Sequence, residues 1–166
     1  MTAHALIELI KYKWHAKTRH GIHSPFVYDF IASLIYKKKL HPLKGNSFYH
    51  QQLLTLIANH YGSTGIYSLT DEVNTENAKP GLHDLIWLNI SDTERWKKTF
   101  ESNLPLLNPN SIIAISNIHK TEKHTVAWES LYKSDKVKLS MDLYGIGLLF
   151  FKEEFKQKQH FIIKYP

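Results

Sequence analysis

Cysteine is absent from the 166-residue sequence, which excludes disulfide bonds, thiolate zinc ligands and cysteine nucleophiles together. The sequence also has no run close to the ~20 uncharged apolar residues that cross a bilayer. Its opening, MTAHALIELIKYKWH, lacks the long apolar segment and the small-residue cleavage site of a signal peptide. We therefore expect a cytoplasmic protein with no membrane partner, whose chemistry depends on hydroxyl, imidazole and carboxylate groups.

The composition is that of an ordinary globular protein. Apolar residues make up 43% of the chain and charged residues 22%, which excludes a disordered or collagen-like sequence. No internal repeat, low-complexity tract or linker divides the chain. Its length predicts a single domain over residues 1–166.

Positive charge is concentrated in the N-terminal part of the chain. The net charge is +6, and residues 1–45 hold eight Lys and Arg against only Glu8 and Asp29. Seven of the eleven histidines also precede residue 61, so acidification makes this part more basic. A polyanionic partner and a surface charged only for solubility are both consistent with this distribution.

Residues 3–17 have the pattern of an amphipathic helix. Leu6, Ile7, Ile10 and Trp14 share one face at helical spacing, and we expect this face to pack into the core. The apolar face is narrow and would be needed there, which disfavours a membrane-surface role for the helix.

Two further helices are expected before residue 62. Ser24 is a good N-cap, Pro25 suits the first helical position, and apolar residues then recur at helical spacing as far as residue 35. The third helix covers residues 47–61 and ends near Gly62. Residues 1–62 are thus predicted to form a helical layer.

The remaining residues, 63–166, predict an α/β half. Residues 65–70, 84–90 and 111–118 are short runs of strand formers, typical of buried parallel strands. A helix that begins after Ser91 or Asp92 separates the second and third runs, and residues 71–83 leave room for one short helix. Asp71 is the expected N-cap of that short helix.

A further helix and an antiparallel ending follow. TEKHTVAWESLYKS predicts a helix with Val126, Ala127 and Leu131 inward. Two strand-like runs flank residues 144–147, as in a hairpin, and residues 159–165 predict a last strand. Trp14, Trp87 and Trp128 are expected to face the core.

Two stretches resemble one branch of the class I S-adenosylmethionine-dependent methyltransferases, a branch associated with Bacteroidetes-type bacteria. RHGIHSPFVYDFI, residues 19–31, resembles its His-Gly-Ile-His-Ser-Pro-Phe entry into a helix, and residues 127–165 resemble its closing strands. The resemblance implies a truncated Rossmann-like methyltransferase fold, with a mostly parallel sheet and an antiparallel C-terminal hairpin.

The middle of the chain departs from that family. The family holds its cofactor with a glycine-rich loop after the first strand and an acidic residue after the second. Here no glycine lies in residues 66–80, and residues 71–83 are too few for two further strands with their helices. The departures imply a methyltransferase-like protein impaired in cofactor binding, which acts as a binding module for a protein partner or a second copy. We assign it no cofactor and no catalytic residue.

Two other functions remain open. A compact active methyltransferase would use Asp71 and Glu72 to bind the ribose of S-adenosylmethionine, because they follow the first strand at the edge where open parallel sheets bind ligands. A basic RNA-binding module would neutralise phosphates with basic residues of the N-terminal part. The candidates are Arg19, Lys37, Lys38 and Lys39.

Histidines at the helix junction do not predict a metal site. His15, His20 and His23 are close in sequence, but this spacing does not make three imidazoles converge on one ion. His20 and His23 more simply belong to a tight turn that leads into the second helix. No Ser-His-Asp order, Walker loop or His-Glu-x-x-His sequence is present, so no hydrolase or phosphotransferase is predicted.

Overall fold

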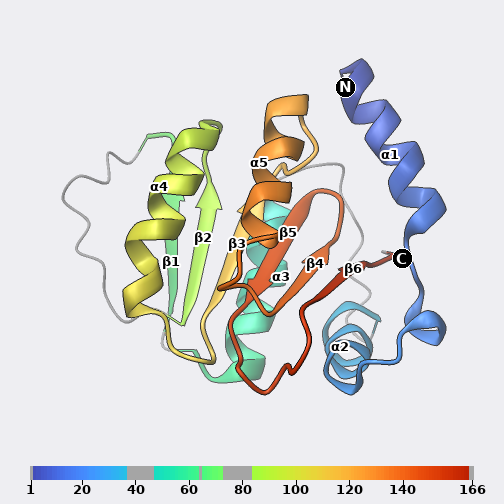
Figure 1. Cartoon of the computed structure of the whole chain (residues 1–166), viewed down its shortest axis with the longest axis vertical. Coiled ribbons are helices and arrows are strands. Elements are labelled where there is room, and N and C mark those ends of the chain that lie inside the picture. The colour runs from blue at the N-terminus through green and yellow to red at the C-terminus, as the bar shows by residue number, and fades with distance from the viewer. Residues whose placement is uncertain (1, 37–46, 64, 73–83, 165–166) are drawn as a thin grey trace.

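The computed structural model of the chain describes residues 2–36, 47–63, 65–72 and 84–164. An all-helical beginning is followed by six strands and the helices between some of them (Figure 1). The helical part comprises α1 (Ala3–His15), η1 (Arg19–Gly21), α2 (Pro25–Phe30), the π-helical η2 (Ile31–Tyr36) and α3 (Ser47–Tyr61). The remainder comprises β1 (Ile66–Thr70), β2 (Leu85–Asn89), α4 (Thr93–Asn103), η4 (Leu104–Leu106), β3 (Ile112–Ser116), α5 (Glu122–Tyr132), β4 (Leu139–Asp142), β5 (Ile146–Phe150) and β6 (Gln159–Ile162).

The six strands form one mixed sheet in the order β1-β2-β3-β5-β4-β6. The neighbours β1, β2 and β3 are parallel, and β6 is parallel to β4. β5 lies antiparallel between β3 and β4. The sheet is therefore mostly parallel with an antiparallel β4–β5 hairpin, as the sequence predicts for an α/β fold.

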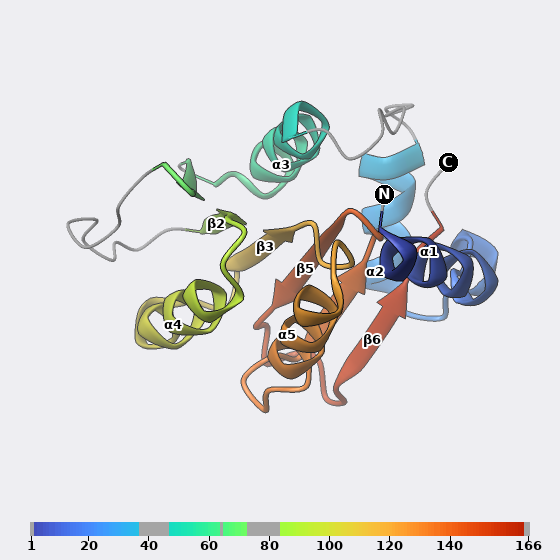
Figure 2. The same ribbon diagram turned by 90° about the horizontal axis from the view of Figure 1, so that it is seen from above.

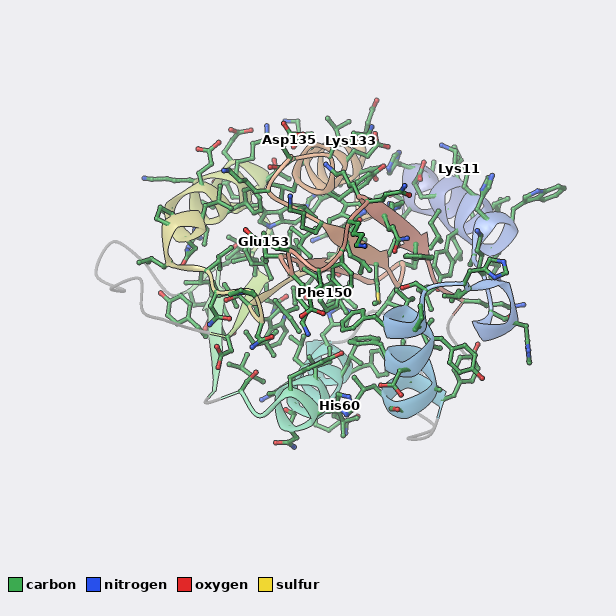
Figure 3. The ribbon with its side chains drawn as sticks, turned by 60° about the horizontal axis from the view of Figure 1, so that its bottom comes forward. Lys11, His60, Lys133, Asp135, Phe150 and Glu153 are labelled. Atoms are coloured by element: carbon green, nitrogen blue, oxygen red, sulfur yellow. The ribbon has the colours of Figure 1, made fainter. Side chains whose placement is uncertain are left out.

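Helices cover both faces of the sheet (Figure 2). On one face, α2, η2 and α3 pack in a core that includes Phe150, which meets the rings of Phe26 and Phe30 edge-on; Phe150 is labelled in Figure 3. On the other face, α4 and α5 bury Trp96 and Trp128. Successive residues of the central strands point alternately into the two cores, which explains why these strands are apolar throughout.

The orientation predicted for the first helix is wrong. Leu6, Ile7, Ile10 and Trp14 are exposed, Trp14 to 84%, and the helix contributes only Ala5 to the buried residues. α1 lies beside α5 at the β6 side of the sheet and does not join the α2–α3 layer (Figure 2). Periodicity identifies an apolar stripe, but hydrogen bonds made by the opposite, polar face decide which face meets the protein.

Other local predictions are confirmed, with one exception. Ser24 and Asp92 cap α2 and α4, and Gly62 ends α3 with a φ of 66° that suits glycine. Val126, expected inward, is 61% exposed, because the adjacent Thr125 and His124 turn inward instead. Trp87 and Trp128 are buried as predicted.

Two predictions concern residues outside the described ranges. The short helix expected within residues 71–83 lies mostly there, as does the lysine run at residues 37–39. Among the described helices, none is long and apolar enough to span a bilayer.

Candidate functional site

A polar cavity opens on the sheet face that α1 and α5 cover, over β4 and β6. Along β4, Leu139 and Met141 point into the α2–α3 core, so Ser140 and Asp142 point to the opposite side. The parallel register places His160 of β6 beside Ser140, and the Ser140 hydroxyl lies 2.8 Å from His160 Nδ1. Asp142 of β4 and His160 of β6 therefore give this side of the cavity polar groups.

A buried imidazole–carboxylate pair lies at the carboxyl end of β3 and β4. His119 Nε2 is 2.7 Å from Asp142 Oδ2, and the two residues are 8% and 4% exposed. Because a carboxylate only accepts, His119 Nε2 is the donor. The backbone N–H of Tyr144 donates to the other carboxylate oxygen at 2.7 Å, so Asp142 is held from two directions.

The second nitrogen of His119 faces a hydroxyl and another carboxylate. Thr125 Oγ1 lies 3.2 Å from His119 Nδ1, and Glu8 Oε2 lies 3.9 Å from it. His4 Nε2 reaches the same Thr125 hydroxyl at 2.9 Å. His119 thus connects α1, α5 and β4 through side-chain contacts.

The order hydroxyl, imidazole, carboxylate gives the pair acid–base chemistry. With Nε2 donating to Asp142, a neutral His119 can accept a proton at Nδ1, on the side of Thr125 and Glu8. Asp142 orients the ring by accepting from its Nε2. The sequence analysis does not identify this cluster, because its members are widely separated along the chain. The local signals are weak: His119 follows β3, and Asp142 ends β4.

Aromatic and charged side chains form the walls of the cavity, whose volume is about 220 Å³. Tyr132 stacks on His160 with ring centroids 4.1 Å apart, and burial lowers the pKa of His160. Trp128 contributes a buried indole N–H that has no hydrogen-bond partner. The lining residues are Glu8, Lys11, Tyr12, His15, His119, Thr125, Trp128, Glu129, Tyr132, Asp142, His160 and Ile162.

Charges at the cavity mouth are largely paired. Lys11 Nζ lies 2.6 Å from Glu8 Oε1, a hydrogen bond that raises the pKa of Lys11. Lys133 Nζ lies 2.7 Å from Glu129 Oε2 in the same way. A polar ligand in the cavity would therefore meet ion pairs whose charges are already balanced. It would also meet the indole N–H of Trp128, which has no hydrogen-bond partner.

The acids chosen from sequence, Asp71 and Glu72, lie elsewhere, just after β1. The carboxylate of Asp71 accepts from the Ser91 backbone N–H at 2.8 Å and from the Ser91 hydroxyl at 2.9 Å. The backbone hydrogen bond is the main cause of a lowered Asp71 pKa, and Arg95 stands 4.0 Å away. Glu72 is exposed. Their role as ribose ligands stays a prediction.

A second hollow, of about 770 Å³, lies between the beginnings of α4 and α5, next to Ser91. Its lining mixes both signs of charge, with Asp92, Glu94 and Glu122 against Lys97 and Lys123. The cap side chain of each helix already accepts from one backbone N–H of the first turn, that of Glu94 in α4 and that of His124 in α5. This hollow therefore carries one more acidic than basic side chain and offers no basic surface for an anionic ligand.

The remaining sequence candidates add no site. His20 and His23 are exposed, and His23 precedes the cap Ser24. No group of three His, Asp or Glu within the described ranges is arranged to hold a metal ion. Lys37, Lys38 and Lys39 lie outside the described residues, so the RNA-binding prediction stays open.

Comparisons with known proteins gave no relative. No family model, no curated protein and no solved structure matches the chain.

Proposed function

We propose that this protein is a methyltransferase-like binding module, related to class I S-adenosylmethionine-dependent methyltransferases and impaired in cofactor binding. The main support is the position of Asp71. Its two carboxylate oxygens bind Ser91, which directly precedes the cap of α4, so this acid ties β1 to the turn after β2. A ribose would have to displace contacts that hold two strand ends together.

The connection between the first two strands also supports the proposal. β1 ends at Thr70, its neighbour β2 begins at Leu85, and the two are paired in parallel along their whole length. One parallel crossover already takes a dozen or more residues, and the interval between the two strands is little longer than that. The resemblance calls for a further strand in this interval to present a ribose-binding acid.

Calorimetric titration with S-adenosylmethionine and S-adenosylhomocysteine tests the proposal. We expect no heat of binding from either compound. Micromolar binding of either one would overturn the proposal and favour the compact active enzyme. In that case methyl transfer from labelled cofactor in lysate should disappear in the Asp71→Ala/Glu72→Ala double variant, with circular dichroism as the control for folding.

A further inference from the structure

The outward face of α1 is apolar from its first turn to its last. Leu6, Ile7, Ile10 and Trp14 are 46%, 52%, 58% and 84% exposed. Their spacing places them in one stripe on the helix surface. Apolar side chains exposed together in this way mark an interaction surface more often than apolar residues scattered singly.

Basic residues border the stripe. At 100° per residue, Lys11 and Lys13 project on opposite sides of it, and both are exposed. Lys17, also exposed, follows the end of the helix. Figure 3 labels Lys11 on α1 at the periphery of the molecule.

The single acid of α1 is turned the other way. The side chain of Glu8 is only 12% exposed, because it points toward His119 and binds Lys11 from the cavity side. Lys11 is paired with this acid, so the outward face combines the apolar stripe with the charges of Lys13 and Lys17. A complementary surface is both apolar and anionic.

Polar contacts fix the helix with the stripe outside. Tyr144 donates its hydroxyl proton to the Ala5 carbonyl at 2.6 Å, and Tyr12 donates to the Ile163 carbonyl. Rotation of the stripe inward would break these bonds. The exposure of the stripe is thus part of the folded structure.

We propose that α1 binds the surface of an anionic lipid bilayer, lying in the plane of the interface with its stripe among the headgroups. A helix with an apolar stripe, flanking lysines and a tryptophan is suited to this position, because acidic headgroups neutralise the lysines while the apolar groups leave water. A second copy of α1 fits less well, since it would bring like-charged lysine rows together.

The proposal is independent of cofactor binding, and it changes one expectation from sequence. The sequence disfavours a membrane-surface role because the apolar face is expected to fill the core, but in the structure this face is exposed, so that reason does not apply. Surface binding needs no spanning helix.

Tryptophan fluorescence gives a direct test. Trp87, Trp96 and Trp128 are 7%, 0% and 1% exposed, so a change caused by lipid reports mainly Trp14. The full chain is mixed with vesicles of phosphatidylcholine alone or with phosphatidylglycerol added. We expect a blue shift, quenching by brominated lipid and cosedimentation with the anionic vesicles only, all weakened by salt.

Variants distinguish binding through the α1 stripe from non-specific adsorption to the vesicles. Ile7→Ser/Ile10→Ser should weaken binding about tenfold or more, because two apolar contacts are lost. Val126→Ser is the matched control, since Val126 is 61% exposed on α5, outside the stripe, and its loss should leave binding unchanged. Circular dichroism checks that both variants are folded.

Three outcomes would overturn the proposal. These are the absence of a Trp14 signal with anionic vesicles, equal binding to neutral vesicles, and equal loss of binding in both variants. Self-association without lipid that depends on Ile7 and Ile10, measured by sedimentation, would assign the stripe to a second copy instead. The cofactor titration described above is unaffected by any of these results.

Discussion

Gly147 of β5 lies directly against the indole ring of Trp128 on α5. A Cβ atom placed on this glycine would stand 2.6 Å from two ring carbons, Cη2 and Cζ3, a separation that real side chains do not show. Trp128 is 1% exposed and Gly147 lies in a strand buried throughout. Helix α5 can therefore approach the sheet this closely only because position 147 has no side chain.

Gly147→Ala should accordingly destabilise the protein. The added methyl group forces the indole or the helix to move, and overpacking of this kind costs about 1–3 kcal/mol. Urea denaturation followed by circular dichroism measures the change. Gly65→Ala is the matched control, because a Cβ at Gly65 meets nothing within 4 Å. Equal stability of the two variants would contradict the close packing of Trp128.

The His119–Asp142 pair should show strong coupling. His119→Leu leaves the carboxylate of Asp142 buried without its imidazole partner, which costs about 3–5 kcal/mol of unfolding free energy. The double variant His119→Leu/Asp142→Leu removes both polar groups and should be less destabilised than the single variant. Urea denaturation of both single variants and the double variant completes the cycle; additive effects would refute the coupling.

Stability should fall with acidification because of His50. Trp87 Nε1 donates to Ser116 Oγ at 2.8 Å, and the same hydroxyl lies 2.8 Å from Nδ1 of the buried His50 ring. Burial lowers the pKa of His50 to about 4 from its ordinary 6.5. Between these values the unfolded chain binds a proton that the native protein does not, so stability is full above pH 6.5 and declines toward pH 4 by about 3 kcal/mol.

The measurement is urea denaturation at several pH values between 4 and 7.5. His50→Gln should flatten the decline, although burial also lowers the pKa of His160 and His124, so some slope will remain. If the unfolding free energy of His50→Gln falls with pH in parallel with that of the wild-type protein, His50 is not the cause of the decline.

Tyr144 should hold α1 in place. Tyr144→Phe removes the hydrogen bond to the Ala5 carbonyl, and a bond of this kind contributes about 1 kcal/mol, which corresponds to roughly fivefold faster local opening. Hydrogen exchange should therefore accelerate in α1 and stay unchanged in β3. Tyr28→Phe, at an exposed tyrosine of α2, provides the control. Uniform acceleration across all elements would indicate global destabilisation instead.

The sequence predicts the elements well because their signals are local. The cap at Ser24, the turn residue Gly62 and the apolar runs of β1 to β3 depend on neighbours within a few positions. The hairpin near residue 144 is of the same kind. The α/β class and the mostly parallel sheet follow from the order of such elements.

Prediction fails where distant parts of the chain meet. The direction of the α1 stripe is decided by Tyr144 and Ile163, both far away in sequence. The cluster of His119, Thr125 and Asp142 likewise forms only when β3, α5 and β4 are in place. A histidine just after one strand and an aspartate at the end of another were the available signals, and neither is specific without the topology.

The backbone bridge between Lys17 and the residues after β6 has a consequence for synthesis of the chain. The N–H of Lys17 donates to the Ile162 carbonyl, and the N–H of Lys164 donates to the Lys17 carbonyl. During synthesis, the backbone of Lys17 can therefore form these bonds only after nearly every other element has left the ribosome. Until then the outer edge of β4 is also unpaired, so nascent chains expose an edge that can add a foreign strand.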